Sequence, residues 1–322
     1  MKAEQQYIDL FSQCEAMICR HSAEVLNAPR AKAFADFERL GFPTRKQEKY
    51  KYTEVSKYFA PDYGLNLNRL EFPVNPYEVF KCDVPNMSTS LYFVVNDAFD
   101  KHVHPSAQLP EGVIFGSLKD VAEQHPELVK KYYGKLADTS KDGVVAFNTM
   151  FAQDGVLMYV PKNVVMERPV QLVNILRADV NTMVNRRILI ILEEGAQAKL
   201  LICDHAMDEV NFLSTQVVEA FIGENAVFDL YELEETHNST VRFNNLYVHQ
   251  EARRPPRPAR TARPLTFSAA TIWQSPSPAA SRSRRTEPQQ HERIARSSSS
   301  GRFLSRYGLS GCRPCGSRRR PR

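Results

Sequence analysis

The sequence predicts a mainly β protein, in which a β core follows an α-helical and α+β N-terminal region. Apolar residues recur at helical spacing near the start of the chain, whereas seven short segments rich in Val, Ile, Leu, Phe and Tyr follow one another in its middle. The composition then changes abruptly. We therefore divide the chain into an N-terminal region (1–143), a β core (144–251) and a tail (252–322).

Residues 1–42 are expected to form two helices. The second begins near Pro29, because proline is tolerated in the first turn of a helix, and ends at Gly41, because glycine is favoured just after a helix. In the first helix, apolar residues recur every three or four positions and therefore lie on one face: Tyr7, Leu10, Phe11, Cys14, Met17 and Ile18.

The rest of the N-terminal region mixes strands and helices. We expect a buried strand at 91–95, and a helix that begins at Ser117 with a capping-box-like pattern and runs toward Tyr133. Interleaved aromatic and basic residues precede the strand, as on nucleic-acid-binding surfaces, but acidic residues interrupt the positive charge and favour ordinary packing. These residues are Tyr50, Tyr52, Tyr58, Phe59, Arg45, Lys46, Lys49 and Lys51.

The β core shows no helical stripe of useful length. Residues 194–201 and 224–231 match at their acidic, turn, alanine and apolar positions with an offset of 30 residues. A repeat made of strands and tight turns favours a stacked solenoid, with a β-sandwich as the alternative. The expected strands are Val156–Val160, Val170–Leu176, Ile188–Leu192, Ala198–Cys203, Gln216–Ile222, Ala226–Leu233 and Val241–His249.

Five segments resemble the SufB/SufD family of iron–sulfur cluster assembly proteins, in the order in which that family has them. Gly41–Thr53 (GFPTRKQEKYKYT) is similar to the N-terminal signature of the SufD branch, and Phe147–Pro161 (FNTMFAQDGVLMYVP) to the start of the core that SufB and SufD share. The other three segments are Val164–Leu172, Glu193–Ala196 and Leu246–Glu251.

The resemblance covers about residues 28–251. It implies a right-handed parallel β-helix core and membership of a cytoplasmic complex with a SufB-like paralogue and a SufC-like ATPase. An iron–sulfur cluster is implied only at the level of that complex, so no cofactor is expected on this chain alone. The family residues thought to help hold a cluster, and the helices that dock SufC, lie beyond the matched region. The resemblance therefore assigns no catalytic, cofactor-binding or metal residue here.

Two groups of potential metal ligands stand out, but metal binding is not favoured for either, and the second group is expected to lie at the surface. Cys203, Asp204 and His205 are consecutive, but neighbouring strand residues point to opposite faces and do not converge on one ion. His102 and His104 share a strand face but lack a clear third ligand. The chain contains neither Gly-x-x-x-x-Gly-Lys-Ser/Thr nor Gly-x-Gly-x-x-Gly, so ATP hydrolysis is expected to come from a partner.

The composition favours a cytoplasmic protein without a membrane partner. The first residues lack the apolar segment of a signal peptide, and the run Ile188–Leu192 is far shorter than the roughly 18 residues of a membrane span. Six cysteines scattered through 322 residues do not form the dense disulfide framework of a small secreted domain.

The tail differs from the body in charge. Residues 1–251 contain 25 basic and 35 acidic residues, a net charge of −10, whereas residues 252–322 contain 17 Arg, no Lys and two Glu, a net charge of +15. The arginines of such a tail could bind the phosphates of a nucleic acid. Cys312 and Cys315 could form half of a zinc site. Arginine without lysine is instead typical of GC-rich codons read in a shifted frame, which is the interpretation that we favour.

The tail is expected to be disordered, because it is poor in apolar residues and its arginines repel one another. A solenoid that stops before this tail lacks its next layer. The last rung, which includes Leu246 and Val248, is then expected to expose a strand edge that permits self-association.

The resemblance to the SufB/SufD family, together with the missing nucleotide-binding motifs, implies a non-catalytic scaffold subunit of a SufBCD-type complex. A β-helix enzyme acting on polysaccharide is the first alternative, but it requires clustered carboxylates and an export signal. A nucleic-acid-binding protein is the second alternative and depends wholly on the tail, so a nucleic-acid partner is not expected.

The frame interpretation predicts an inserted or deleted base near codon 252. Restoring the frame should replace the arginine-rich tail with apolar strands and turns that continue the solenoid. Resequencing this region is the measurement, and an unchanged frame in independent clones would contradict the interpretation.

Overall fold

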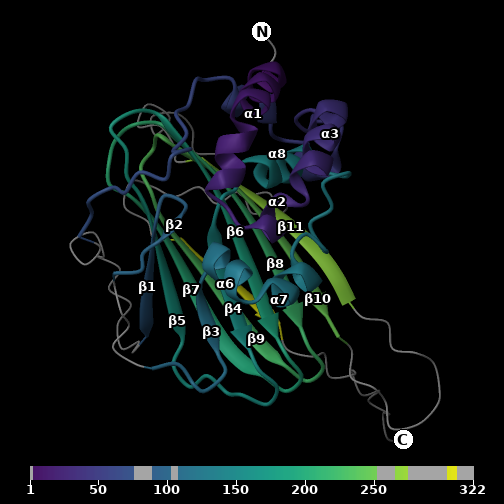
Figure 1. The fold of residues 1–322 in the computed structure, drawn as a ribbon, viewed down its shortest axis with the longest axis vertical. Helices are drawn as coiled ribbons and strands as arrows, with labels where there is room; N and C mark the ends of the chain where they lie inside the picture. Colours follow the sequence, from purple (N-terminus) through teal and green to yellow (C-terminus); the bar gives the residue numbers. More distant parts are fainter. Residues whose placement is uncertain (1–2, 76–88, 103–107, 252–264, 275–302, 310–322) are drawn as a thin grey trace, which may run out of the picture.

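The computed structural model describes residues 3–75, 89–102, 108–251, 265–274 and 303–309. Its centre is a parallel β-helix, in which the chain passes alternately through two sheets that enclose a common apolar core (Figure 1). The strand orders are β11-β10-β8-β6-β4-β3 and β12-β9-β7-β5-β1-β2. From β4 to β10 each strand pairs in parallel with the next strand but one, which confirms the predicted fold class over a β-sandwich.

One turn of the β-helix takes about 30 residues. Val170 lies beside Leu200, which lies beside Leu230. This offset equals that of the sequence repeat, so the repeat reports stacked coils. The strands of the coils, on which all seven predicted segments fall, are β4 (Gly155–Val160), β5 (Val170–Leu176), β6 (Thr182–Leu192), β7 (Gln197–Ala206), β8 (Phe212–Ile222), β9 (Val227–Glu235) and β10 (Thr240–Gln250).

The turns between the two sheets explain which residues the sequence repeats. Gly195 and Asn225 occupy equivalent positions and have φ angles of 69° and 58°. Glycine and asparagine tolerate this left-handed conformation better than other residues. The alanines that follow, Ala196 and Ala226, are buried in the core of the coil. A small residue is therefore retained at each tight corner.

Aliphatic side chains fill most of the coil interior. Ile188, Val218 and Leu246 stack on successive strands of one sheet, and Val170 and Leu200 stack on the other. Burial of each such side chain stabilises the fold by about 1.5–3 kcal/mol. The stacking of coils thus supplies the main apolar core.

Helices of the N-terminal half cover the outer face of the β6-β8-β10 sheet where its strands begin (Figure 1). Tyr7, Phe37 and Phe147 pack together there, in one cluster with Phe243 of β10. Both predicted helices are confirmed, and the second ends at Gly41, whose φ is 61°. The helices of this layer are α1 (Ala3–Arg20), α3 (Arg30–Leu40), η1 (Glu48–Tyr50), α4 (Val55–Phe59) and α8 (Gly143–Phe151). The short helix α2 (Glu24–Asn27) packs instead with residues near the other end of the sheet, such as Val121 and Val129.

Within this helical layer, Arg30 ties α3 to α8. Its buried side chain donates from Nη1 to the carbonyl oxygens of Thr149 (3.0 Å) and Met150 (2.7 Å), and from Nη2 to the carbonyl oxygen of Ala152 (2.6 Å). Carbonyls at the end of a helix lack partners within that helix, and a cation is favourable near them. One buried guanidinium therefore caps the C-terminal end of α8.

Two further helices, α6 (Leu118–Gln124) and α7 (Pro126–Tyr132), cover the same sheet where its strands end. The predicted cap is confirmed, because Oγ of Ser117 accepts a hydrogen bond from the backbone of Asp120 (3.1 Å). The prediction of one helix running toward Tyr133 is wrong. Pro126 starts a second helix there, since proline cannot continue the first.

Three short strands complete the described sheets before the coil begins. The strand expected at 91–95 is confirmed as β1 (Ser90–Val95), which pairs in parallel with β5. A two-residue strand, β2 (Ala98–Phe99), and β3 (Ile114–Ser117) pair antiparallel with β1 and β4 respectively.

The β core was expected to be free of helices, but its first residues form α8. Every residue of α8 is buried, so the helix has no polar face and no amphipathic pattern. It packs with the N-terminal helices and the sheet together.

The expectation of a wholly disordered tail is wrong for two segments. In the tail, β11 (Leu265–Gln274) pairs antiparallel with β10, and β12 (Phe303–Leu309) pairs antiparallel with β9. The strand edges expected to be open are therefore paired, which removes the basis for self-association through them. The antiparallel direction also shows that neither strand continues the parallel coil. Cys312 and Cys315 lie outside the described residues.

Close approach between coils predicts a strong effect of Gly155→Ala. A Cβ atom at Gly155 would collide with the backbone carbonyl of Arg187 in the next coil, whereas a Cβ at Gly116 meets nothing within 4 Å. We expect Gly155→Ala to lower the free energy of unfolding by about 2 kcal/mol or more, and Gly116→Ala to change it little. Urea unfolding of both variants measures this, and equal stabilities would contradict the described strand spacing.

Candidate functional site

Charged side chains gather inside the coil, at the end of the lumen away from the aliphatic stack. We call this group the interior polar cluster. Its members are almost fully shielded from solvent and come from six strands: Asn174 of β5, Arg186 of β6, Asp204 of β7, Ser214 and Gln216 of β8, Glu232 and Glu234 of β9, and Arg242 and Asn244 of β10.

The strand register explains how the sequence assembles this cluster. Asn174, Asp204 and Glu234 lie side by side on β5, β7 and β9. In the facing sheet, Ser214 of β8 lies beside Arg242 of β10. Because side chains alternate between the faces of a strand, these residues continue the same inward rows as the aliphatic stack. The lumen therefore changes from apolar to charged along its length.

Arg242 is the centre of the cluster. Its Nη1 lies 2.6 Å from Oε2 of Glu234 and 3.1 Å from Oδ2 of Asp204, and its Nη2 lies 3.4 Å from Oε1 of Glu232. Arg186 adds a second contact to Asp204, with 2.8 Å between Nη2 and Oδ1. Two guanidinium groups thus hold three carboxyl groups together.

The pKa values follow from burial and from these contacts. For Asp204, burial alone would raise the pKa, but Arg242 and Arg186 outweigh it and lower the pKa below its usual range. For Glu234, burial outweighs Arg242 and raises the pKa to about 7, and burial likewise raises the pKa of Glu232. The cluster therefore contains one firmly ionised carboxylate and two carboxyl groups that retain protons more readily than usual.

Several polar atoms of the cluster have no hydrogen-bond partner among the described residues. They include Nε and Nη1 of Arg186, Oε1 of Gln216 and Oδ1 of Asn174. Donors and acceptors both occur in this set, and internal water commonly satisfies such mixed groups. The polar end of the lumen is thus chemically suited to small hydrogen-bonding species.

A second buried ion pair lies on the outer face of the sheet that contains β6, β8 and β10. Arg187 Nη2 contacts Oε2 of Glu219 at 2.8 Å, and that carboxylate also accepts hydrogen bonds from the backbone N–H groups of Gly134, Leu136 and Ala137. The Glu219 carboxylate thus accepts one ion-pair contact and three backbone hydrogen bonds. The pair anchors the loop after α7 to β6 and β8.

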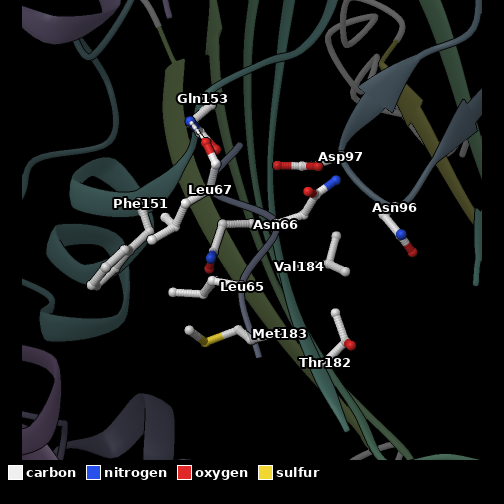
Figure 2. Close-up of a pocket in the computed structure, with 11 residues that line it drawn as sticks. Leu65, Asn66, Leu67, Asn96, Asp97, Phe151, Gln153, Thr182, Met183 and Val184 are labelled. Atoms are coloured by element: carbon white, nitrogen blue, oxygen red, sulfur yellow. Dashed lines mark hydrogen bonds between the residues drawn. The ribbon is translucent and has the colours of Figure 1, made fainter. Parts of the chain in front are cut away.

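A small hollow lies beside the start of β6 (Figure 2). Leu67, Asp97 and Gln153 are among its lining residues, and Gln153 Nε2 donates to the carbonyl oxygen of Leu67 at 3.1 Å. Beside the hollow, Arg69 forms ion pairs with Asp97 (2.7 Å) and Asp154 (3.6 Å). The space suits about one water molecule, so it is too small for a substrate.

The three consecutive potential ligands do not converge. Asp204 points into the lumen toward Arg186, whereas Cys203 and His205 lie on the opposite face of β7. His205 Nδ1 lies 3.6 Å from Oε2 of Glu235, and burial lowers the pKa of His205. Within the described ranges, no group of three or more His, Cys, Asp or Glu side chains is placed to hold a metal ion. His102 is exposed, and His104 lies outside the described residues.

The aromatic and basic residues of the N-terminal region pack as expected. Tyr50 is buried, and its hydroxyl donates to Oδ2 of Asp142 at 2.9 Å. Lys49 Nζ lies 3.0 Å from the same oxygen and 3.2 Å from the hydroxyl of Tyr247 in β10. Tyr52, by contrast, is exposed. The segment Gly41–Thr53 thus fastens the helical layer to the last parallel strand.

None of the described helices is long and apolar enough to cross a bilayer.

Comparison with known families gives two adjoining matches. The model described as the SufBD protein N-terminal region matches residues 1–172, and the model described as the SUF system FeS cluster assembly, SufBD core domain, matches residues 174–254. Together they cover the N-terminal layer and the coil.

Individual relatives agree with these matches. The chain is 29% identical to the chloroplastic SufBD family protein ABCI8 of Arabidopsis thaliana over 61% of this chain and 37% of the relative. It is 28% identical to the iron–sulfur cluster assembly protein SufD of Bacillus subtilis over 60% of this chain and 43% of the relative. The chain therefore spans less than half the length of these curated relatives.

The contacts of Arg242 predict a large effect of Arg242→Met. The substitution would leave three buried carboxyl groups with Arg186 as their remaining cation among the described residues, so we expect the free energy of unfolding to fall by roughly 3–5 kcal/mol at neutral pH. The loss should shrink toward pH 5, where the carboxyl groups can take up protons.

Urea unfolding at several pH values measures this effect. Arg45→Met is the matched control, because the Arg45–Glu54 pair is exposed and should contribute less than about 1 kcal/mol. Equal effects of the two substitutions would show that the interior contacts do not stabilise the fold.

Proposed function

The chain belongs to the SufBD family, and from this premise we propose that it acts as a SufD-like, non-catalytic scaffold subunit in iron–sulfur cluster assembly. The observation that carries the proposal is the pair of adjoining family matches, which together span residues 1–254 apart from residue 173 and coincide with the helical layer and the parallel coil. The SufD branch is supported by the motif Gly41–Thr53 and by the similarity to SufD of Bacillus subtilis.

A scaffold role is consistent with the physical character of the coil. Each strand from β6 to β8 is paired on both sides, and the lumen is filled by stacked side chains and buried ion pairs. Such a body presents fixed outer surfaces on which partner proteins can dock. We propose that these surfaces bind a SufB-like paralogue and a SufC-like ATPase, that any cluster is held at the level of the complex, and that the complex is cytoplasmic.

Co-expression of the full chain with the SufB-like and SufC-like proteins of the same organism tests the proposal. We expect the three proteins to copurify and to transfer a cluster to an apo-ferredoxin when supplied with iron, a sulfur donor and ATP. The chain alone should not hydrolyse ATP. Failure to copurify under conditions in which the other two proteins associate would overturn the proposal.

A further inference from the structure

The interior polar cluster carries a charge imbalance in a space closed to solvent. Among the described residues it holds two guanidinium groups, of Arg186 and Arg242, and three carboxyl groups, of Asp204, Glu232 and Glu234. The exposed fractions of these side chains range from 1% to 9%. With every group ionised, these five side chains would have a net charge of −1, shielded from bulk solvent.

A buried, unbalanced charge is costly, and binding a proton removes it. Asp204 contacts both guanidinium groups and is the least able to take the proton. Glu232 and Glu234 share Arg242, and burial raises the pKa of both. Asn244 Nδ2 donates to Oε1 of Glu232 at 2.7 Å. The proton therefore belongs to the Glu232–Glu234 pair.

The position of the pair in the fold gives the proton a structural role. Glu232, Glu234 and Arg242 all lie on β9 and β10, the last strands of the parallel coil, whereas Asp204 and Arg186 belong to earlier strands. When the proton leaves, the carboxylate of Glu234 on β9 repels that of Asp204 on β7. This repulsion acts between the layer formed by β9 and β10 and the preceding coil. Opening of the last layer would relieve it by admitting water.

We propose that the interior polar cluster is a proton-binding site of the Glu232–Glu234 pair, and that the bound proton holds β9 and β10 against the preceding coil. The other groups that face Glu234 are Asp204 from β7, Arg242 from β10 and Thr236 from its own loop, and β12 flanks the other side of β9. His205 and Glu235 lie on the opposite strand faces and pair with each other.

The direction of the pH effect follows from the raised pKa. The pKa of Glu234 rises from 4.5 to about 7 on folding, so the folded chain holds more protons than the unfolded chain between these values. The stabilising contribution is complete below pH 4.5, declines as the pH rises toward 7, and is lost above it. The last layer should therefore open more readily at pH 8 than at pH 5.5.

Amide hydrogen exchange of the full chain tests the proposal, with β6 as the internal reference. After correction for intrinsic exchange rates, we expect the protection of β9 and β10 relative to β6 to fall by up to about tenfold per pH unit between pH 5.5 and 7, and then to level off. Glu234→Gln should remove this dependence and keep the protection high at pH 8. Glu209→Gln, at an exposed glutamate, should leave it unchanged.

Two results would overturn the proposal: protection of β9 and β10 that does not change with pH, or an unchanged dependence in both Glu234→Gln and Glu232→Gln. A direct measurement covers the case in which these variants do not fold. Carbon-13 NMR of the glutamate carboxyl groups in the unmodified chain should show one group that titrates near pH 7. Completion of every glutamate titration below pH 5.5 would rule the site out.

Discussion

The hydrogen-bonded register between successive coils is the constraint from which the other features follow. Because each residue of a strand lies beside one about 30 positions away, side-chain direction is inherited from coil to coil. Ile188, Val218 and Leu246 consequently form one aliphatic row, and Asn174, Asp204 and Glu234 form one polar row. A slip of one residue would exchange the interior and exterior of a whole strand.

The two buried ion pairs show different consequences of this register. On the outer face, Glu219 is matched by one arginine and three backbone donors, so its charge is fully compensated locally. In the lumen, Arg242 must serve three carboxyl groups at once. Replacing a buried ion pair by apolar residues is often neutral or stabilising, so such a cluster is poor evidence of stability alone.

Much of the fold could be predicted from the sequence because periodicity and local turn chemistry decide it. The 30-residue repeat, the left-handed turn residues and the N-terminal helices all have short-range signals, such as Gly195 and Gly41. Helix α8 could not be recognised, since a helix buried on all sides lacks a polar stripe. The interior polar cluster was missed because Arg186, Glu234 and Arg242 resemble solvent-facing strand residues until the register places them inside. Asp204 was noticed, but as one of three neighbouring ligands and not as the partner of two distant arginines.

The cap that Arg30 provides to α8 has a consequence for the order in which the chain can be assembled. Its carbonyl acceptors lie 119 to 122 positions later in the sequence. At a synthesis rate of about 5–20 residues per second, the first helices wait roughly 6–24 s before these acceptors exist. During that interval Tyr7 and Phe37 also lack Phe147, against which they finally pack. The native packing of the helical layer is therefore complete only after residues 147–152 have been synthesised, although sequence matching divides the chain near residue 173.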